Sequence, residues 1–281
     1  MLSKIFTTDT GRLRNGWWIA IYLAMLAAGL FPTIMISARL HHDITMWEQG
    51  ALILAATWLC QALRRRPITE VTGALDATWA RQLALGAALG VGLMALPAAS
   101  MLVFGWVSFS WTGAGFGGLA LPILGMAGVA IAEELLFRGF IFQRVGAGLG
   151  EWPALLLLAA LFLLTHLDNE GMRGPAASLA MVNIFVAGIM FGLAFLATRR
   201  LALPIGIHFG ANVCEGNVLG FAVSGTGEPS LLIARPGEAP AWLTGGSVGI
   251  EGSLFGMVGV IVLTLAIAWY RKRATTKTSV A

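Results

Sequence analysis

Long apolar segments without charge dominate this chain, and they constrain its fold more than any other feature. The run from 115 to 131, GFGGLALPILGMAGVAI, contains no charged residue. Charged residues make up 11% of the 281 residues and hydrophobic residues 57%, whereas a typical soluble domain has about 25% charged residues. So few charges cannot cover the surface of a soluble fold. The sequence therefore predicts an integral membrane protein.

The fold class follows from what a bilayer tolerates. Only helices and closed barrels satisfy the backbone in lipid, and the sequence lacks the alternating strands of a membrane barrel. We therefore predict an all-α, polytopic membrane helix bundle. A membrane helix needs about 20 apolar residues, and we predict about eight transmembrane helices. The candidate spans are 17–39, 47–63, 82–106, 117–137, 153–167, 177–198, 202–221 and 252–270.

The basic residues indicate the orientation of these spans. Lys and Arg gather in alternate loops, as expected when those loops are cytoplasmic. This alternation predicts both termini in the cytoplasm and favours a bacterial inner membrane. It also explains the net charge of +4 without a nucleic-acid partner. The basic residues on this side are Lys4, Arg12, Arg14, Arg64, Arg65, Arg66, Arg81, Arg138, Arg144, Arg199, Arg200, Arg271, Lys272, Arg273 and Lys277.

The chain shows no internal repeat and no second domain, so residues 1–281 are predicted to form a single membrane domain. The segment from about 222 to 251 is rich in Gly and Pro, which predicts an irregular outer loop. Gly86 and Gly90 have the small-xxx-small spacing that allows membrane helices to pack closely.

Three charged residues interrupt the apolar sequence in AEELLFRGF, residues 132–140. Glu134 and Arg138 are four residues apart, so they share a helix face and can form an ion pair. Glu133 points about 100° away and has no local partner. A desolvated carboxylate of this kind suits a general base. The alternative is that all three residues belong to a buried structural network.

Two further polar groups lie in apolar segments. His208 and Asn212 are four residues apart and face the same way, so they could hold a developing oxyanion. His166 lies in another span, and either histidine could instead ligate a metal or be a satisfied core residue. The helical rise places Glu133, His166 and His208 near mid-bilayer, where they could meet around one cavity. Glu215 also lies on the His208 face, but near a helix end, so we expect it to be solvated.

These residues form a pattern that resembles the CPBP intramembrane proteases, also called the CAAX protease and bacteriocin-processing (Abi) family. That family has a Glu-Glu-x-x-x-Arg motif, then Phe-x-x-x-His, then His-x-x-x-Asn or Asp. Here the motifs are Glu133-Glu134-Leu-Leu-Phe-Arg138, Phe162-Leu-Leu-Thr-His166 and His208-Phe-Gly-Ala-Asn212, in order and each on a predicted helix. The resemblance covers about 118–221, the predicted catalytic core.

The resemblance implies an intramembrane endopeptidase that acts on a membrane-associated peptide or protein substrate within the lipid bilayer. Glu133 and His166 would activate a water, and His208 and Asn212 would steady the tetrahedral oxyanion. Glu134 and Arg138 would support this geometry. The family is often labelled as metalloproteases, and Glu133, His166 and His208 would suit a zinc ion with an open site. We favour a mechanism that requires no cofactor, because no HExxH motif occurs.

Two alternatives remain at the level of the sequence. A proton-coupled transporter or a non-catalytic membrane scaffold or immunity protein could also use buried Glu, His and Arg residues. A transporter would more often show paired repeats with broken helices in both halves. Here the buried polar residues are concentrated in the second half.

Overall fold

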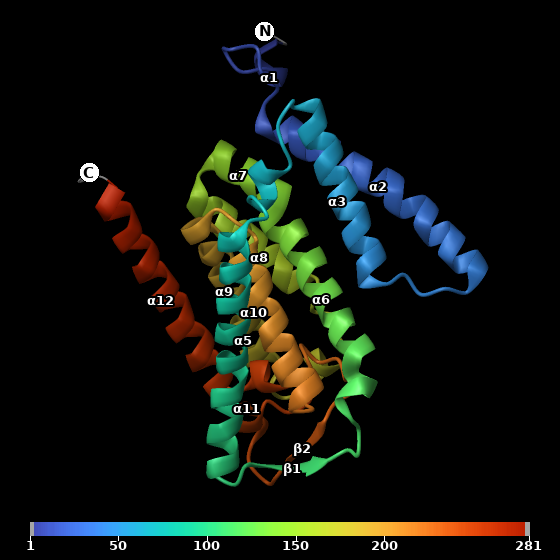
Figure 1. Cartoon of the computed structure of the whole chain (residues 1–281), viewed down its shortest axis with the longest axis vertical. Helices are drawn as coiled ribbons and strands as arrows, with labels where there is room; N and C mark the ends of the chain where they lie inside the picture. Colours follow the sequence, from blue (N-terminus) through green and yellow to red (C-terminus); the bar gives the residue numbers. More distant parts are fainter. Residues whose placement is uncertain (1–2, 279–281) are drawn as a thin grey trace.

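The fold is a helix bundle elongated along one axis, as a computed structural model shows (Figure 1). The structure describes residues 3–278, so residues 1–2 and 279–281 of the predicted single domain lie outside the described residues. Helices dominate, and the strands form one short two-stranded sheet in the described part. The predicted all-α, polytopic membrane bundle is confirmed.

The longer helices account for most of the chain. They are α2 (Asn15–Leu40), α3 (Met46–Leu63), α5 (Ala77–Val103), α6 (Ala120–Glu134), α7 (Phe140–Leu149), α8 (Glu151–Leu164), α9 (Ala177–Thr198), α10 (Ala202–Asn212) and α12 (Leu254–Thr278). The short helices are α1 (Ser3–Phe6), α4 (Thr69–Thr72) and α11 (Ala241–Thr244). The strands β1 (Val107–Trp111) and β2 (Leu232–Pro236) pair in antiparallel fashion. Segments Leu135–Gly139 and Val213–Val218 are π-helical, and 3₁₀ turns occupy Phe116–Leu119, Glu170–Arg173 and Ile250–Gly252.

Each of the eight predicted spans coincides with a helix. Within residues 3–278, five helical segments are long and apolar enough to cross a membrane: Asn15–Leu40, Ala77–Val103, Gly117–Leu149, Ala177–Thr198 and Leu254–Ala274. Helix α8 is apolar but shorter. The prediction was wrong about the end of the fifth span, because α8 stops at Leu164 rather than at 167.

The two ends of the bundle differ in chemistry. Helix α1 and the last turns of α12 lie at the same end, whereas β1 and β2 lie at the opposite end (Figure 1). At the first end, Arg200 donates to both carboxylate oxygens of Asp76, at 2.6 and 3.0 Å, and Arg199 donates to Glu151 at 2.8 Å. This arrangement agrees with an even number of membrane crossings. The cytoplasmic location of this end stays a prediction.

Helix α10 packs against α5 along a seam of four glycines: Gly86, Gly90, Gly206 and Gly210. A Cβ atom at Gly90 would lie 2.1 Å from the carbonyl oxygen of Ile207, and one at Gly210 would lie 2.2 Å from that of Ala87. The two backbones therefore approach as closely as glycine allows, which is typical of small residues between membrane helices. This seam fixes the position of the helix that carries His208 and Asn212.

We expect Gly90→Ala to destabilise the fold, because its methyl group would collide with backbone rather than with a movable side chain. Overpacking of this kind costs on the order of 1–3 kcal/mol. The matched control is Gly92→Ala on the same helix, where an added Cβ meets no atom within 4 Å. Thermal unfolding of the purified proteins in detergent is the measurement. Equal melting temperatures for both variants would contradict the seam.

Candidate active site

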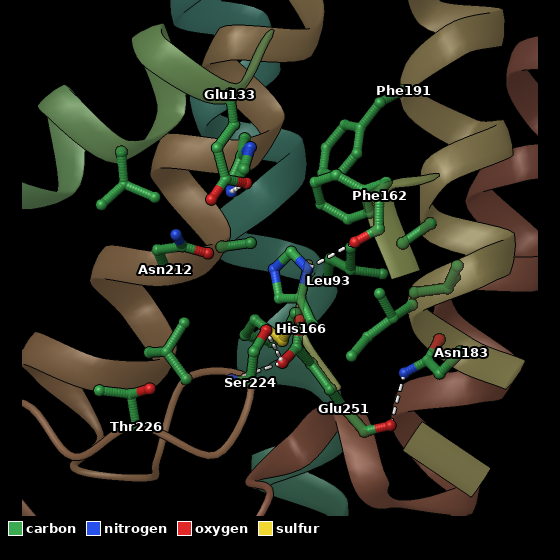
Figure 2. Close-up of a pocket in the computed structure, with 18 of the residues that line it drawn as sticks. Leu93, Glu133, Phe162, His166, Asn183, Phe191, Asn212, Ser224, Thr226 and Glu251 are labelled. Atoms are coloured by element: carbon green, nitrogen blue, oxygen red, sulfur yellow. Dashed lines mark hydrogen bonds and ion pairs between the residues drawn. The ribbon is translucent and has the colours of Figure 1, made fainter. Parts of the chain in front are cut away.

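A cavity of about 190 Å³ lies among α5, α6, α9, α10 and the outer loop. Glu133, His166, His208 and Asn212 all line it, as predicted from the motifs. Figure 2 shows Glu133, Asn212 and His166 approaching this space from different elements. The cavity extends from the middle of the helices to the loop. The mid-membrane position expected for Glu133 and His208 stays a prediction.

Glu133 lies in the last turn of α6 and is the carboxylate most available for chemistry. Its side chain is 20% exposed, and its Oε2 atom is buried without a hydrogen-bond partner. The same oxygen lies 3.8 Å from Nε2 of His208, too far for a direct hydrogen bond. An unpartnered, buried carboxylate oxygen that faces a cavity can accept a hydrogen bond from a water or a substrate.

Glu134 joins two motifs through one oxygen atom. Its Oε1 accepts from Nη1 of Arg138 at 3.0 Å and lies 3.1 Å from Nδ1 of His208. The side chains of Glu134 and Arg138 are 0% and 1% exposed, and Arg138 also donates from Nη2 to the Gly188 carbonyl at 2.9 Å. Because a carboxylate accepts, Nδ1 of His208 is the donor, and its Nε2 atom is left to face Glu133 and the cavity.

One π-helical turn lies within the Glu133–Arg138 motif and another directly follows the His208–Asn212 motif. Leu135–Gly139 follows Glu134 at the end of α6, and Val213–Val218 follows Asn212 at the end of α10. Single π turns inside α-helices occur frequently at functional sites. Their position here, immediately after the carboxylates and after the amide, marks the two helices as locally irregular where the polar residues meet.

Aromatic rings enclose the buried cation and the histidine. The Arg138 guanidinium lies 4.7 Å from the centroid of Phe162 and 5.1 Å from that of Phe191. Phe191 also stacks on the His208 ring, with centroids 5.0 Å apart. These rings exclude water from the ion pair, which strengthens its electrostatic interaction. They also restrict the orientation of His208.

His166 lies in a turn just after α8, not on a helix as predicted. The Nδ1 atom of His166 is 2.7 Å from the Phe162 carbonyl, which also accepts from the Thr165 hydroxyl at 2.8 Å. Side chains that hydrogen-bond to a main-chain carbonyl in this way compete with the main-chain N–H group that would otherwise bond to it and continue the helix. Since a carbonyl only accepts, Nδ1 of His166 carries the proton and its Nε2 atom is a free acceptor.

Asn212 is 7% exposed and lines the cavity. In the described part of the chain its side-chain amide makes no hydrogen bond to another residue, and none is drawn to it in Figure 2. Buried amides are normally paired. The free amide of Asn212 is therefore suited to a ligand in the cavity, with an N–H donor to offer.

The outer loop closes one side of the cavity through contacts that the sequence motifs do not reveal. Glu215 is 0% exposed and accepts from the main-chain N–H of Ile250 at 2.6 Å, so the expectation that it is solvated was wrong. Glu251 accepts from the N–H and the hydroxyl of Ser224, at 2.7 and 2.6 Å. Glu251, Ser224 and Glu228 line the cavity. No periodic pattern or motif signals these residues, because the loop is irregular and its contacts are long-range.

A resident metal finds no obvious set of ligands here. In residues 3–278, no group of three or more His, Cys, Asp or Glu side chains has the arrangement needed to hold a metal ion. Glu133, His166 and His208, the residues that would hold a zinc ion in the alternative mechanism, line one cavity without forming such a group. A mechanism that requires no metal stays a prediction.

The family comparison agrees with this geometry. Residues 115–214 match the family described as type II CAAX prenyl endopeptidase Rce1-like. The matched segment contains Glu133, Glu134, Arg138, His166, His208 and Asn212. No curated protein and no solved structure matches the chain significantly.

Residues 115–214 thus match an Rce1-like domain of the CPBP/CAAX protease family, and the predicted resemblance is confirmed over these residues. This family supports intramembrane protease activity in general. Together with the apolar helices, it indicates an integral membrane protein.

We expect Arg138→Met to destabilise the protein by about 3–5 kcal/mol, because it leaves the buried Glu134 carboxylate without its cation. The double variant Glu134→Gln/Arg138→Met should recover part of this loss, since it removes both charges. The exposed Arg235→Met provides a control with little effect. Unfolding in detergent measures all three. Additive losses in the double variant would show that Glu134 and Arg138 are not coupled.

Proposed function

We propose that this protein is an intramembrane endopeptidase in which Glu133 acts as the general base. The observation that carries the proposal is the position of Glu133: its Oε2 atom is buried and unpartnered, in a cavity shared with two histidines and a free amide. Each of these four side chains has at least one polar atom without a hydrogen bond to the described residues. A general base must reach the proton that it abstracts, directly or through one water.

The hydrolysis begins with a water held between Glu133 and Nε2 of His166. Glu133 takes a proton from this water as the oxygen attacks the scissile carbonyl carbon, and the carbonyl oxygen becomes an oxyanion. Protonated Glu133 then gives the proton to the leaving amine as the carbon–nitrogen bond breaks. The products are a carboxylic acid, which passes its remaining proton to the amine or to solvent, and the amine. Glu133 returns to its ionised starting state.

The oxyanion is stabilised from the other side of the cavity by Asn212 and His208. Asn212 donates from its amide. His208 donates from Nε2 in the imidazolium form, because Nδ1 already donates to Glu134. Preorganised donors of this kind are worth about 3–4 kcal/mol each in transition-state stabilisation. Glu134 and Arg138 are positioning residues, since Glu134 fixes the tautomer and orientation of His208.

The substrate class follows from the surroundings. The cavity is enclosed by membrane helices, so the substrate is a membrane-associated peptide or protein that reaches it from the lipid bilayer or from the loop end. The distribution of Arg and Lys supports cytoplasmic termini, and we place the protein in a bacterial inner membrane. With the termini in the cytoplasm, the end of the cavity formed by the outer loop faces the opposite side.

Glu133→Gln should lower the rate of peptide cleavage by about 10²–10⁴-fold, because the amide cannot accept the proton. Cleavage of a membrane peptide by the purified protein in detergent or liposomes, followed by mass spectrometry, is the measurement. Glu238→Gln, an exposed carboxylate of the outer loop, is the control for loss of a negative charge. A folded Glu133→Gln variant that cleaves at the wild-type rate would rule out this base.

Metal dependence is tested in the same assay. We expect cleavage to continue after dialysis against a chelator, with no metal bound in stoichiometric amount by elemental analysis. Loss of cleavage on chelation, followed by its return on addition of zinc, would instead assign a metal role to the histidines and Glu133.

A further inference from the structure

The loop end of the cavity is rich in hydrogen-bond acceptors. Beyond the four motif residues, the carboxylates of Glu228 and Glu251 and the amide of Asn183 line it, and no Lys or Arg side chain does so in the described part of the chain. None of these three residues belongs to the motifs. Glu228 and Glu251 also lie outside the segment that matches the family.

Glu251 is held rigidly in this cavity. Its Oε2 atom accepts two hydrogen bonds from Ser224, and its main-chain carbonyl accepts from Nδ2 of Asn183 at 2.7 Å. In the view of Figure 2, Glu251 and Ser224 lie on the side of His166 away from Glu133. The Oε1 atom of Glu251 accepts no hydrogen bond from the described residues, so this carboxylate has capacity for a donor.

Asn183 provides an independent indication of a ligand. It is 1% exposed and lines the cavity, yet its Oδ1 atom has no hydrogen-bond partner. Buried amide oxygens are rarely left unpaired. Nδ2 of Asn183 already donates to the Glu251 carbonyl. The amide therefore cannot rotate to present a donor to the cavity without losing that hydrogen bond. The unsatisfied group is therefore an acceptor, and its natural partner is an N–H donor.

Glu228 also lines the cavity and is partly buried, close in sequence to the exposed Thr226. Partial burial raises the pKa of the Glu228 carboxyl above its ordinary value. A cation beside this group would offset the desolvation that burial imposes on its ionised form. Glu228 is thus a second carboxylate of the same cavity with no cationic partner in the described residues.

We propose that Glu251, Asn183 and Glu228 form an acidic subsite that binds a basic side chain of the substrate close to the scissile bond. The inference rests on the proposed endopeptidase function and names its substrate class: membrane peptides with a Lys or Arg beside an apolar segment. An ammonium or guanidinium group supplies several N–H donors and a positive charge, which match the acceptors present. The apolar wall formed by Leu93, Met126 and Ile184 suits the methylene stem of such a side chain.

The same chemistry disfavours a free carboxylate in this subsite. A substrate terminus placed here would meet two carboxylates without an Arg or Lys to pair with, and burying an unpaired charge is costly. The structure therefore assigns internal or amine-bearing peptide segments to the cavity, rather than a C-terminal carboxylate.

Binding to an inactive protein tests the subsite separately from catalysis. Full-length Glu133→Gln is titrated in detergent with fluorescent apolar peptides that differ at one position, which is Lys, norleucine or Glu. The position is moved along the peptide so that each register is sampled. We expect the best Lys peptide to bind about 10- to 100-fold more tightly than its norleucine counterpart, the range expected for hydrogen bonds to a charged group. The Glu peptide should bind most weakly.

Variants then assign the preference to the subsite. In the Glu133→Gln background, Glu251→Gln should reduce the ratio of Lys to norleucine affinity toward one, since glutamine keeps the contacts to Ser224 and loses only the charge. Glu238→Gln should leave the ratio unchanged. Ser224→Ala loosens the loop and should affect both peptides alike, which distinguishes loop anchoring from cation binding.

The outcomes separate the two proposals. A Lys to norleucine ratio near one in every register, or no binding of any peptide, overturns the acidic subsite. A clear Lys preference that survives Glu251→Gln and Glu228→Gln together also overturns it. Failure of wild type to cleave a Lys peptide that Glu133→Gln binds well would count against the endopeptidase function and leave the subsite standing.

Discussion

The buried carboxylate of Glu134 is the interaction on which the site depends. One oxygen serves both the guanidinium of Arg138 and the imidazole of His208, and Arg138 in turn bonds the Gly188 carbonyl. These contacts connect α6, α9 and α10 inside a membrane. A single buried charge is costly there, whereas a paired and hydrogen-bonded set recovers that cost. The network thus makes the three helices mutually dependent. It leaves the Oε2 atom of Glu133 without a hydrogen bond, 3.8 Å from Nε2 of His208.

Two kinds of contact fix the walls of the cavity: close backbone packing and hydrogen bonds from main-chain N–H groups to carboxylates. Along α5 and α10, backbone meets backbone at the glycine seam, so the position of His208 and Asn212 is set by contact that no side chain can adjust. At the loop end, Glu215 and Glu251 fix an irregular segment by accepting main-chain N–H groups. Between regular helices, close packing is enough to fix their positions, because their main-chain N–H and C=O groups are already hydrogen-bonded within each helix. An irregular loop has unpaired N–H groups and needs carboxylates to bind them.

The sequence predicted those features of the fold and the site that depend on neighbouring residues along the chain. Each of the eight segments chosen by hydropathy coincides with a helix. The spacing of Glu134 and Arg138 predicted their ion pair, because residues four apart share a face. Prediction from the sequence failed where contacts between distant or irregular segments determine the structure. The end of α8 depends on side chains that take the Phe162 carbonyl, and the burial of Glu215 depends on Ile250. Glu251 and Asn183 carry no motif, so only the folded chain reveals that they share a cavity with Glu133.

The cavity therefore combines parts with different origins. The segment that matches the family supplies the two histidines, Asn212 and Glu133, all anchored on or beside membrane helices. The outer loop, beyond that segment, supplies Glu228 and Glu251. Rigid helices hold reacting groups at fixed distances, whereas loops tolerate sequence change without loss of the fold. A related protein could keep the same chemistry and accept another substrate by changing the loop residues that line the cavity, provided that the contacts of Ile250 with Glu215 and of Glu251 with Asn183 are kept.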